Sequence, residues 1–348
     1  GHSVPCKKIE IIEASHPVPD ETSQIAGARI LELLSNCTDD DLVIFLLSGG
    51  ASALMESTVD DISLEDLQNT NRLLLNSGAS ISEINPVRSC LSRVKAGGLR
   101  RATQATVICL ILSDVLGNDL NVIGSGPFSD TSPNGELAEQ ILRDRGIWDQ
   151  VPASVRDAVH KVTRAKPADT NSDDRVHQII IGDLNRAIDA AAVEAQKLGL
   201  KPWVVIRTLD GEARDAGKWL GELAASMSTN GSPGMDVIIA GGETTVTVTE
   251  SGVGGRSQEL ATAAALALRG VTGITLLAGG TDGTDGPTDA AGAVVDGSTA
   301  ERAEDLGISL HEALTNNNAY PALEKLGELL ITGPTGTNVA DLVVIVRG

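Results

Sequence analysis

Glycines and small polar residues directly follow several apolar runs that we interpret as strands, and their types and spacing could bind an anion. The apolar run at residues 42–47 leads into Ser48, Gly49, Gly50 and Ser52. In open α/β sheets ligands bind beyond the carboxyl ends of strands, where glycines let backbone N–H groups turn toward an anion. The loop lacks the Lys-Ser or Lys-Thr of a Walker A motif, and no GxGxxG fingerprint follows a strand. The pattern indicates an anion-binding turn, with a tight strand–helix connection as the structural alternative.

Cationic and hydroxyl side chains gather in the segment 84–95. If the chain is helical after Pro86, then Arg88, Ser92 and Lys95 are four and three residues apart and share one face. Such a face suits a phosphate or carboxylate, because arginine supplies a bidentate fork. The alternative is a solvated helix face that binds nothing.

Carboxylates also follow predicted strands. Asp114 comes after the run at 106–112, where a Mg²⁺ bound to nucleotide phosphates would need an oxygen ligand, although it could equally cap a helix or a turn. Asp282, Asp285 and Asp289 follow the run at 274–278. Their spacing does not form an EF-hand loop, because Ala293 occupies the position of the bidentate glutamate.

Arg256 begins a predicted Ala-rich helix at 257–268, directly after two glycines. A cation at a helix N-terminus is opposed by the helix dipole, so the sequence gives only a weak structural reason for an arginine there. We therefore interpret Arg256 as a residue that clamps an anion.

Strands and helices alternate along the chain, which is typical of a parallel α/β architecture. The predicted strands are 8–12, 42–47, 106–112, 178–181, 203–206, 237–240, 274–278 and 342–346, with an exposed hairpin strand at 244–250. The predicted helices are 23–34, 64–77, 84–94, 136–143, 184–198, 211–228, 257–268 and 299–306. The polar stretch 165–175 is the best linker candidate and predicts domains at 1–175 and 176–348, whereas 228–235 suits a surface loop.

Composition excludes several classes of protein. The 348 residues carry a formal net charge of −20, which argues against a nucleic-acid partner because phosphate binding needs a basic surface. No apolar run is long enough to cross a membrane. The four cysteines lack CxxC spacing, which favours free thiols in a reducing cytoplasm. The absence of HExxH and GxSxG motifs argues against a zinc site and a serine hydrolase.

Several long stretches, taken together, resemble the class II glycerate kinase family, whose C-terminal portion is called the MOFRL domain. The matching stretches are SHPVPD (15–20), LLSGGASALM (46–55), SGASISEINPVRSCLSRVKAGGL (77–99), LILSDVLGNDLNVIGSGP (110–127), GGETTVTV (241–248), GGRSQELA (254–261), GGTDGTDGPTDAAGA (279–293), LTNNNAY (314–320) and TGPTGTNVAD (332–341). They follow the order of the family from residue 15 to residue 341.

The resemblance implies an α/β fold of two domains: a Rossmann-like doubly wound sheet, a second domain with a mixed sheet, and a cleft between them. It implies transfer of the γ-phosphoryl group of ATP to D-glycerate, giving 2-phosphoglycerate, with Mg²⁺ accompanying the nucleotide. Arg256 and Asp282 would be catalytic, and Asp114 and Asp285 would bind the metal. The residues expected to bind substrate or nucleotide, all within the matching stretches, are Ser48, Gly49, Gly50, Ser52, Asn85, Arg88, Lys95, Ser125, Gly126, Gly242, Glu243, Thr281, Asn316, Thr335, Gly336 and Asn338.

One feature of the family has no counterpart in residues 1–348. The family carries a Gly-Lys motif ahead of the SHPVPD stretch, and Lys7 and Lys8 do not match it. From this we expect low or absent kinase activity for residues 1–348 alone. Two alternatives stay open: a hydroxypyruvate or tartrate-pathway reductase, and a non-catalytic protein that binds a nucleotide or a hydroxy acid. The expected location is the cytoplasm, the expected ligands are small molecules, and a homodimer is one open oligomeric state.

Overall fold

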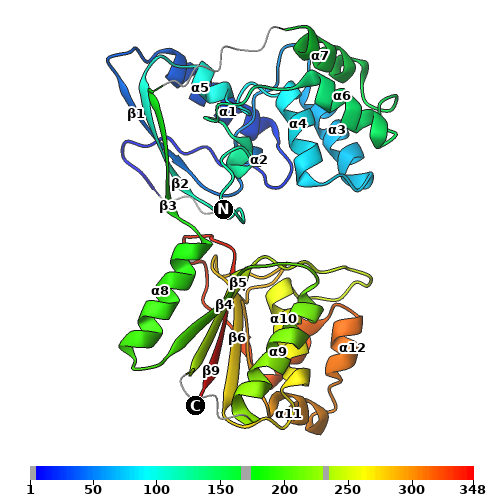
Figure 1. Cartoon of the computed structure of the whole chain (residues 1–348). Coiled ribbons are helices and arrows are strands. Elements are labelled where there is room, and N and C mark those ends of the chain that lie inside the picture. Colours follow the sequence, from blue (N-terminus) through cyan, green and yellow to red (C-terminus); the bar gives the residue numbers. More distant parts are fainter. Residues whose placement is uncertain (1–4, 166–173, 230–234) are drawn as a thin grey trace. The chain divides into compact units, whose positions relative to one another are not determined.

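The computed structural model describes residues 5–165, 174–229 and 235–348. The chain divides into two compact units (Figure 1). Unit 1 comprises Gly1–Leu112 and Asn118–Ile181, and unit 2 comprises Ser113–Gly117 and Gly182–Gly348. The predicted division between residues 175 and 176 stays a prediction, because most of the stretch 165–175 lies outside the described residues. The same holds for most of the predicted loop 228–235.

Unit 1 contains a three-stranded sheet of β1 (Leu42–Leu47), β2 (Thr106–Leu112) and β3 (Val176–Gly182), in that order. Strands β1 and β2 are parallel, so the turns that follow them leave the same edge of the sheet. Alternate residues of β2 are fully buried, Val107 and Cys109 among them. This period of two is the pattern of a strand with one face in the core.

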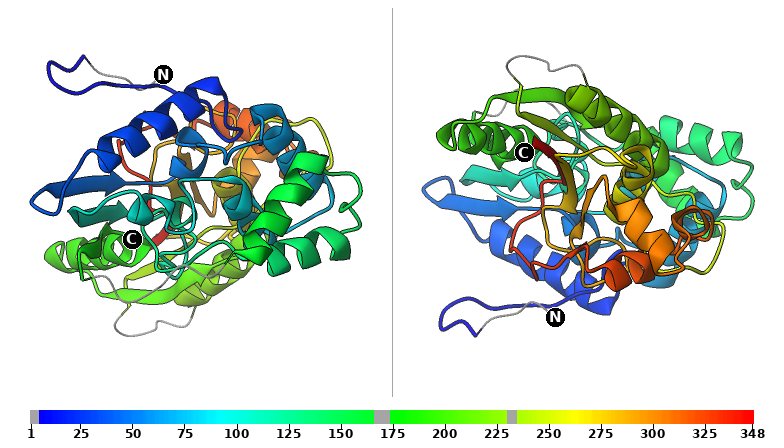
Figure 2. Two further views of the ribbon diagram at one scale, coloured as in Figure 1. Left: turned by 90° about the horizontal axis from the view of Figure 1, so that it is seen from above. Right: turned by 90° about the horizontal axis from the view of Figure 1, so that it is seen from below.

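A group of four helices forms the second core of unit 1 (Figures 1 and 2). These helices are α3 (Leu64–Asn76), α4 (Ile81–Leu91), α6 (Gly135–Asp144) and α7 (Ala153–Arg164). Capping boxes at Ser63 and Ser80 begin the first two. The other helical segments are α1 (Glu21–Ser35), α2 (Ala51–Leu54), α5 (Gly98–Arg101) and the 3₁₀ turn η1 (Ile123–Ser125).

Unit 2 contains a six-stranded mixed sheet in the order β4-β5-β9-β6-β7-β8. Its strands are β4 (Pro202–Leu209), β5 (Val237–Gly242), β6 (Ile274–Gly280), β7 (Gly292–Asp296), β8 (Leu329–Leu330) and β9 (Asp341–Arg347). Strands β4 and β5 are parallel, whereas the remaining neighbours are antiparallel. An α/β fold whose second part has a mixed sheet confirms the expected fold class.

Helices cover both faces of the sheet in unit 2 (Figure 1). Helix α8 (Leu184–Lys197) lies on one face, and α9 (Ala213–Thr229) and α10 (Arg256–Ala267) lie on the other. Helices α9 and α10 pack closely because Gly217 faces the Leu260 carbonyl, where a side chain would overlap the backbone. The remaining helices are α11 (Thr299–Asp305), α12 (Leu310–Thr315) and α13 (Ala319–Leu326).

Two predicted strands are wrong, and one predicted helix ends earlier than expected. Residues 8–12 form no strand, and the exposed side chains of Ile9 and Ile11 agree with the lack of a partner strand. Residues 244–250 form only an isolated bridge, between Thr245 and Glu212, and helix α4 ends at Leu91 rather than at residue 94. Alternation of residue types does not make a strand unless a neighbouring strand accepts its hydrogen bonds.

Several elements were not predicted from the sequence, namely α5, η1, α7, α12, α13, β7 and β8. They are short or polar, so tertiary packing decides them. No helix in the described ranges combines the length and the apolar character that a membrane span requires.

Candidate functional site

Three polar side chains from separate segments of unit 1 meet beyond β1. Ser52 lies in α2, and its Oγ is 2.8 Å from the Oγ of Ser125 in η1. The Ser125 Oγ donates a hydrogen bond of 3.3 Å to Asn85 Oδ1 on α4. The chain enters this arrangement through Gly50, whose φ of 81° is the left-handed conformation that glycine adopts without strain. The predicted anion-binding turn at 48–52 therefore contributes Ser52 to a cluster that also contains Asn85 and Ser125.

Backbone hydrogen bonds between two turns hold Ser125 in place. Ser125 itself has a φ of 62°, a backbone conformation that costs a residue other than glycine about 1–3 kcal/mol. Its carbonyl accepts from the Ala96 N–H at 2.9 Å, and the Gly126 carbonyl accepts from the Gly97 N–H at 2.7 Å. Strain held by surrounding contacts is typical of functional sites.

Substitution of Gly97 by alanine is expected to disrupt this pair of turns. Gly97 has a φ of 73°, and a Cβ atom there would lie 2.6 Å from the Ser129 carbonyl oxygen, so backbone must move. We expect a loss of about 2–4 kcal/mol of unfolding free energy, measured by chemical denaturation. Gly78→Ala is the matched control: its φ is 71° and nothing lies within 4 Å, so it should cost only about 1 kcal/mol. Equal losses in the two variants would contradict the predicted clash.

A fully buried ion pair lies directly behind Ser52. The side chains of Lys95 and Glu56 are both 0% exposed, and Lys95 Nζ is 3.1 Å from Glu56 Oε2. Lys95 Nζ also donates to the Ser52 carbonyl at 2.6 Å and to Ser52 Oγ at 3.2 Å. Glu56 Oε1 accepts from the Ser57 N–H at 3.0 Å and from Ser92 Oγ at 2.5 Å. Burial lowers the pKa of Lys95 to about 8, although Glu56 opposes the shift.

Arg88 supplies a second cation beside the same serine. Its Nη2 donates to the Ser52 carbonyl at 3.3 Å, and its Nε is buried without a hydrogen-bond partner in the described part of the chain. Burial lowers the pKa of Arg88, but an arginine remains charged at neutral pH. An unpartnered buried donor on a cation is the kind of group that an anionic ligand satisfies.

The predicted helical face of Arg88, Ser92 and Lys95 is wrong in its geometry. Helix α4 ends at Leu91, and Ser92 is its extended C-cap, with a φ of −124° and a ψ of 140°. Ser92 therefore turns to Glu56, and Lys95 reaches Ser52 from the following turn. Glu56 was not predicted from the sequence, because a lone glutamate in an apolar stretch gives no signal of its partner.

Arg256 forms two ion pairs in unit 2. Its Nε donates to Asp341 Oδ2 at 2.6 Å, its Nη2 donates to Asp341 Oδ1 at 3.1 Å, and its Nη1 donates to Glu243 at 2.6 Å. These carboxylates offset the opposition of the α10 dipole, so Arg256 has structural partners that the sequence did not reveal. Its side chain is 34% exposed, and its role in phosphoryl transfer stays a prediction.

Asp285 caps the N-terminus of α10. Its Oδ1 accepts from the Ser257 N–H at 3.1 Å, and its Oδ2 accepts from the Gln258 N–H at 2.8 Å. Burial raises the pKa of Asp285 to about 6, although the two backbone N–H groups oppose the shift. Its assignment as a metal ligand stays a prediction, and these hydrogen bonds do not favour it.

Stability should depend on pH through Asp285. Its pKa is raised in the folded chain, so its contribution is fully present below about pH 4 and is lost as the pH rises through about 6. Relative to Asp285→Asn, which cannot titrate, the natural chain should lose about 1 kcal/mol of unfolding free energy between pH 5 and pH 7.5. Urea denaturation of both proteins at the two pH values measures this difference. A difference that does not change with pH would show that Asp285 is fully ionised throughout.

Two loops of unit 2 hold each other beside Arg256. Thr335 Oγ1 donates to the Thr281 carbonyl at 2.5 Å, and Thr281 Oγ1 donates to the Ala340 carbonyl at 2.7 Å. Asn338 Oδ1 accepts from the Ala340 N–H at 3.1 Å, and Asp282 Oδ1 accepts from the Thr284 N–H at 2.9 Å. Gly242 ends β5 opposite Asp341 and leads to Glu243.

Two predicted binding residues lack such contacts. Ser48 and Asn316 are both exposed, and the buried residue of the loop after α12 is Asn317. Asn317 Nδ2 donates to Glu259 at 2.7 Å, so this asparagine stabilises the loop.

In the described ranges no group of three or more His, Cys, Asp or Glu residues could hold a metal ion.

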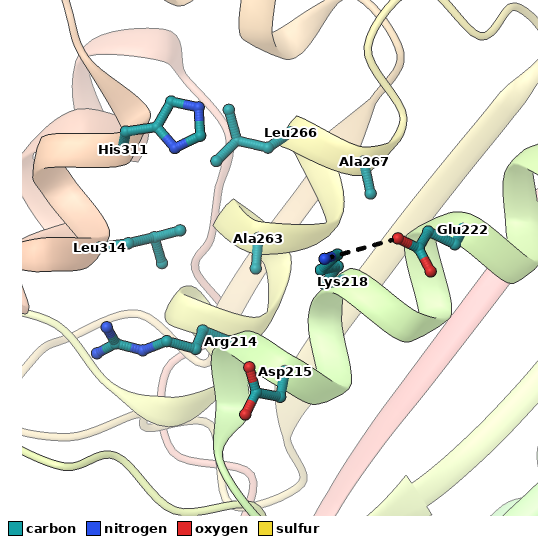
Figure 3. Close-up of a pocket in the computed structure, with 9 residues that line it drawn as sticks. All are labelled: Arg214, Asp215, Lys218, Glu222, Ala263, Leu266, Ala267, His311 and Leu314. Carbon is teal, nitrogen blue, oxygen red and sulfur yellow. Dashed lines mark ion pairs between the residues drawn. The ribbon is translucent and has the colours of Figure 1, made fainter.

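A pocket of about 380 Å³ lies elsewhere in unit 2, between α9, α10 and α12 (Figure 3). Its apolar wall includes Leu266 and Leu314, and Arg214, Lys218 and His311 line its polar part. None of the residues that the sequence analysis proposed as catalytic, binding or metal-ligating lines this pocket.

Comparisons with known proteins agree across nearly the whole chain. Residues 1–160 match a family model described as "Domain of unknown function (DUF4147)", and residues 236–341 match the MOFRL family. A Pyrococcus horikoshii protein named "Glycerate 2-kinase" is 42% identical over 99% of this chain and 80% of its own length. A Thermotoga maritima protein named "D-glycerate 2-kinase" is 44% identical over 99% of this chain and 82% of its own length.

A crystal structure supports the same relationship. The Thermotoga maritima structure described as a glycerate kinase has a TM-score of 0.91 at 43% identity, covering 99% of this chain and 82% of its own. An Agrobacterium vitis relative, 40% identical over 100% of this chain and 80% of its own length, bears a provisional hydroxypyruvate reductase name. Identity of this size over nearly the full chain, together with the polar clusters in both units, shows that the chain belongs to the class II glycerate kinase family.

Proposed function

We propose that this protein transfers the terminal phosphoryl group of ATP to D-glycerate and gives 2-phosphoglycerate. The observation that carries the proposal is the match of 99% of the chain to two relatives named glycerate 2-kinase, at 42% and 44% identity. Transfer of a phosphoryl group depends mainly on positioning and on neutralisation of charge, which polar turns and arginines can supply.

The cluster in unit 1 suits the hydroxy acid. Arg88 and Lys95 carry two positive charges and Glu56 carries one negative charge, so the cluster has a net charge of about +1. This matches a monocarboxylate such as glycerate better than a triphosphate. Arg88 can donate to the carboxylate, while Ser52 and Asn85 offer partners for the hydroxyl groups.

The loops of unit 2 suit the phosphoryl group. Arg256 and Asp282 remain the proposed catalytic residues, with Arg256 stabilising negative charge on the phosphoryl group. Thr281, Thr335, Gly336 and Asn338 remain proposed contacts of the nucleotide. We propose that Mg²⁺ enters with the nucleotide as the substrate MgATP, and that Asp114 and Asp285 remain the candidate carboxylates for it.

Residues 1–348 alone are expected to have low or absent activity, so the test uses a chain that also carries the Gly-Lys segment of the family. Incubation of this extended chain with MgATP and D-glycerate, followed by phosphorus NMR of the product, tests the function. We expect a phosphomonoester on the 2-hydroxyl group. Product on the 3-hydroxyl group would correct the regiochemistry, and ATP consumption that does not depend on glycerate would overturn the proposal.

A reductase is the second candidate, because of the name that the Agrobacterium vitis relative bears. The chain offers no GxGxxG fingerprint for a nicotinamide cofactor, so we expect no oxidation of NADH or NADPH with hydroxypyruvate. A rate of cofactor oxidation that saturates with hydroxypyruvate would favour the reductase.

A cytoplasmic location remains part of the proposal and is supported by the free cysteines of the chain.

A further inference from the structure

The buried ion pair in unit 1 has no direct access to a ligand. Lys95 and Glu56 are both 0% exposed, and Ser52 and Arg88 lie next to the lysine. Burying two charges costs free energy, and well-packed apolar residues of similar volume often stabilise a core equally well. The buried pair can therefore affect a ligand only through the neighbouring side chains that it orients.

Lys95 favours one direction in a chain of hydrogen bonds. An ammonium group only donates, so Ser52 Oγ accepts from Lys95 Nζ at 3.2 Å. When Ser125 Oγ donates to Asn85 Oδ1 at 3.3 Å, Ser52 donates across the 2.8 Å contact between the hydroxyls. In the reverse direction the Ser52 proton would have no acceptor among the hydrogen bonds of this group. In this series of hydrogen bonds each group therefore donates in the direction from Lys95 toward Asn85.

The amide of Asn85 lies at the end of this series of hydrogen bonds, and its orientation agrees with that direction. Because Oδ1 accepts from Ser125, Nδ2 must point away from the serines, and it makes no hydrogen bond in the described part of the chain. Asn85 is half-buried on α4, one helical turn before Arg88. A donor on Asn85 and a cation on Arg88 can therefore serve one ligand from the same face of the helix.

We propose that Glu56 and Lys95 are positioning residues, which orient the Asn85 amide through Ser52 and Ser125 so that Asn85 Nδ2 donates to an oxygen atom of the hydroxy acid. This inference rests on the proposed function. Glu56 holds the ammonium group through its Oε2, and Glu56 Oε1 is itself held by Ser92 and by the Ser57 N–H. Neither Glu56 nor Lys95 touches the substrate in this arrangement.

A neutral double variant, Glu56→Gln with Lys95→Met, tests the proposal without leaving a lone buried charge. We expect its dissociation constant for D-glycerate, measured by calorimetry, to rise at least 10-fold while ATP binding is unchanged. Its thermal midpoint should stay within a few degrees of that of the natural chain, since both charges leave together. A purely structural pair would give a stable variant with unchanged affinity for D-glycerate, and that result would overturn the proposal.

A double-mutant cycle with Asn85→Ala shows whether the effect passes through the amide. Asn85→Ala alone should weaken D-glycerate binding, and adding the Glu56 and Lys95 substitutions should then cause no further loss. Losses that multiply would mean that the ion pair acts by another route, contrary to the proposal.

Ser125→Ala provides a test that keeps the ion pair and so does not depend on the folding of the double variant. It removes the link between Ser52 and Asn85 and should weaken D-glycerate binding as much as the double variant does. Unchanged binding would overturn the proposed relay. The matched control makes the same two substitutions at the exposed pair Glu194 and Lys197, which are 2.9 Å apart, and should leave binding unchanged.

The natural chain separates failure of this inference from failure of the proposed function. If the unsubstituted protein does not bind D-glycerate, the proposed function fails. If it binds D-glycerate but the cycle with Asn85→Ala is additive, only the positioning role fails.

Discussion

Replacement of Arg88 by alanine is expected to weaken D-glycerate binding about 100-fold, because the proposed carboxylate contact is charge-assisted and partly desolvated. The buried Nε of Arg88 lacks a hydrogen-bond partner in the described ranges, and its Nη2 reaches only the Ser52 carbonyl. A bound carboxylate would satisfy this donor. Isothermal calorimetry with D-glycerate measures the effect directly and does not depend on the rate of turnover.

Two further variants test whether the planar fork of Arg88 and its position cause the loss of binding. Arg88→Lys keeps the charge but loses the planar fork, so we expect an intermediate loss of about 10-fold. Arg93→Ala removes an exposed arginine five residues away and should leave the dissociation constant unchanged. Normal affinity in a folded Arg88→Ala protein would refute the assignment of the carboxylate site.

Replacement of Arg256 by lysine is expected to slow phosphoryl transfer about 1000-fold with little change in the dissociation constants of either substrate. An arginine that stabilises charge in a phosphoryl-transfer transition state contributes about 10³–10⁵ to the rate, and lysine cannot reproduce the fork. Turnover of the chain extended with the Gly-Lys segment, measured with radiolabelled ATP, detects a loss of this size. The matched control is Arg269→Lys, which alters an exposed arginine that forms two hydrogen bonds to Glu304 in the same unit.

The structure offers a competing explanation for a loss at Arg256, because this residue also neutralises Asp341. Burial raises the pKa of Asp341, so loss of the arginine would leave a buried carboxylate unpaired. The neutral pair Arg256→Gln with Asp341→Asn removes both charges. We expect it to fold and to remain nearly inactive. Recovery of turnover in this double variant would assign Arg256 a structural role only.

Local sequence was sufficient for much of the fold. Apolar runs such as 42–47 and 106–112 predicted β1 and β2 to the residue, because short continuous apolar runs are typical of strands. Alternate residues of β2 are buried, whereas Leu42, Ile44 and Leu46 of β1 are exposed. Local sequence gave a wrong prediction where a neighbouring strand decides whether a segment becomes a strand. Residues 244–250 alternate like a strand, yet Thr245 forms only one bridge.

The sequence by itself determined which residues could do chemistry and the turns on which they lie. Ser52, Arg88 and Arg256 were all identified from their types and from their positions beside predicted strands and helix ends. These signals are local, because a glycine-rich turn or a cation at a helix N-terminus involves only neighbouring residues.

Only the tertiary structure decided which of these side chains have partners. Glu56 meets Lys95 across 39 positions of the chain, and Arg256 meets Asp341 across 85. Whether a charge is buried, paired or free depends on segments that are distant in sequence, and no local pattern encodes that distance. For this reason the sequence predicted Lys95 as a binding residue, which stays a prediction, but could not reveal that Lys95 is buried against Ser52 and Glu56.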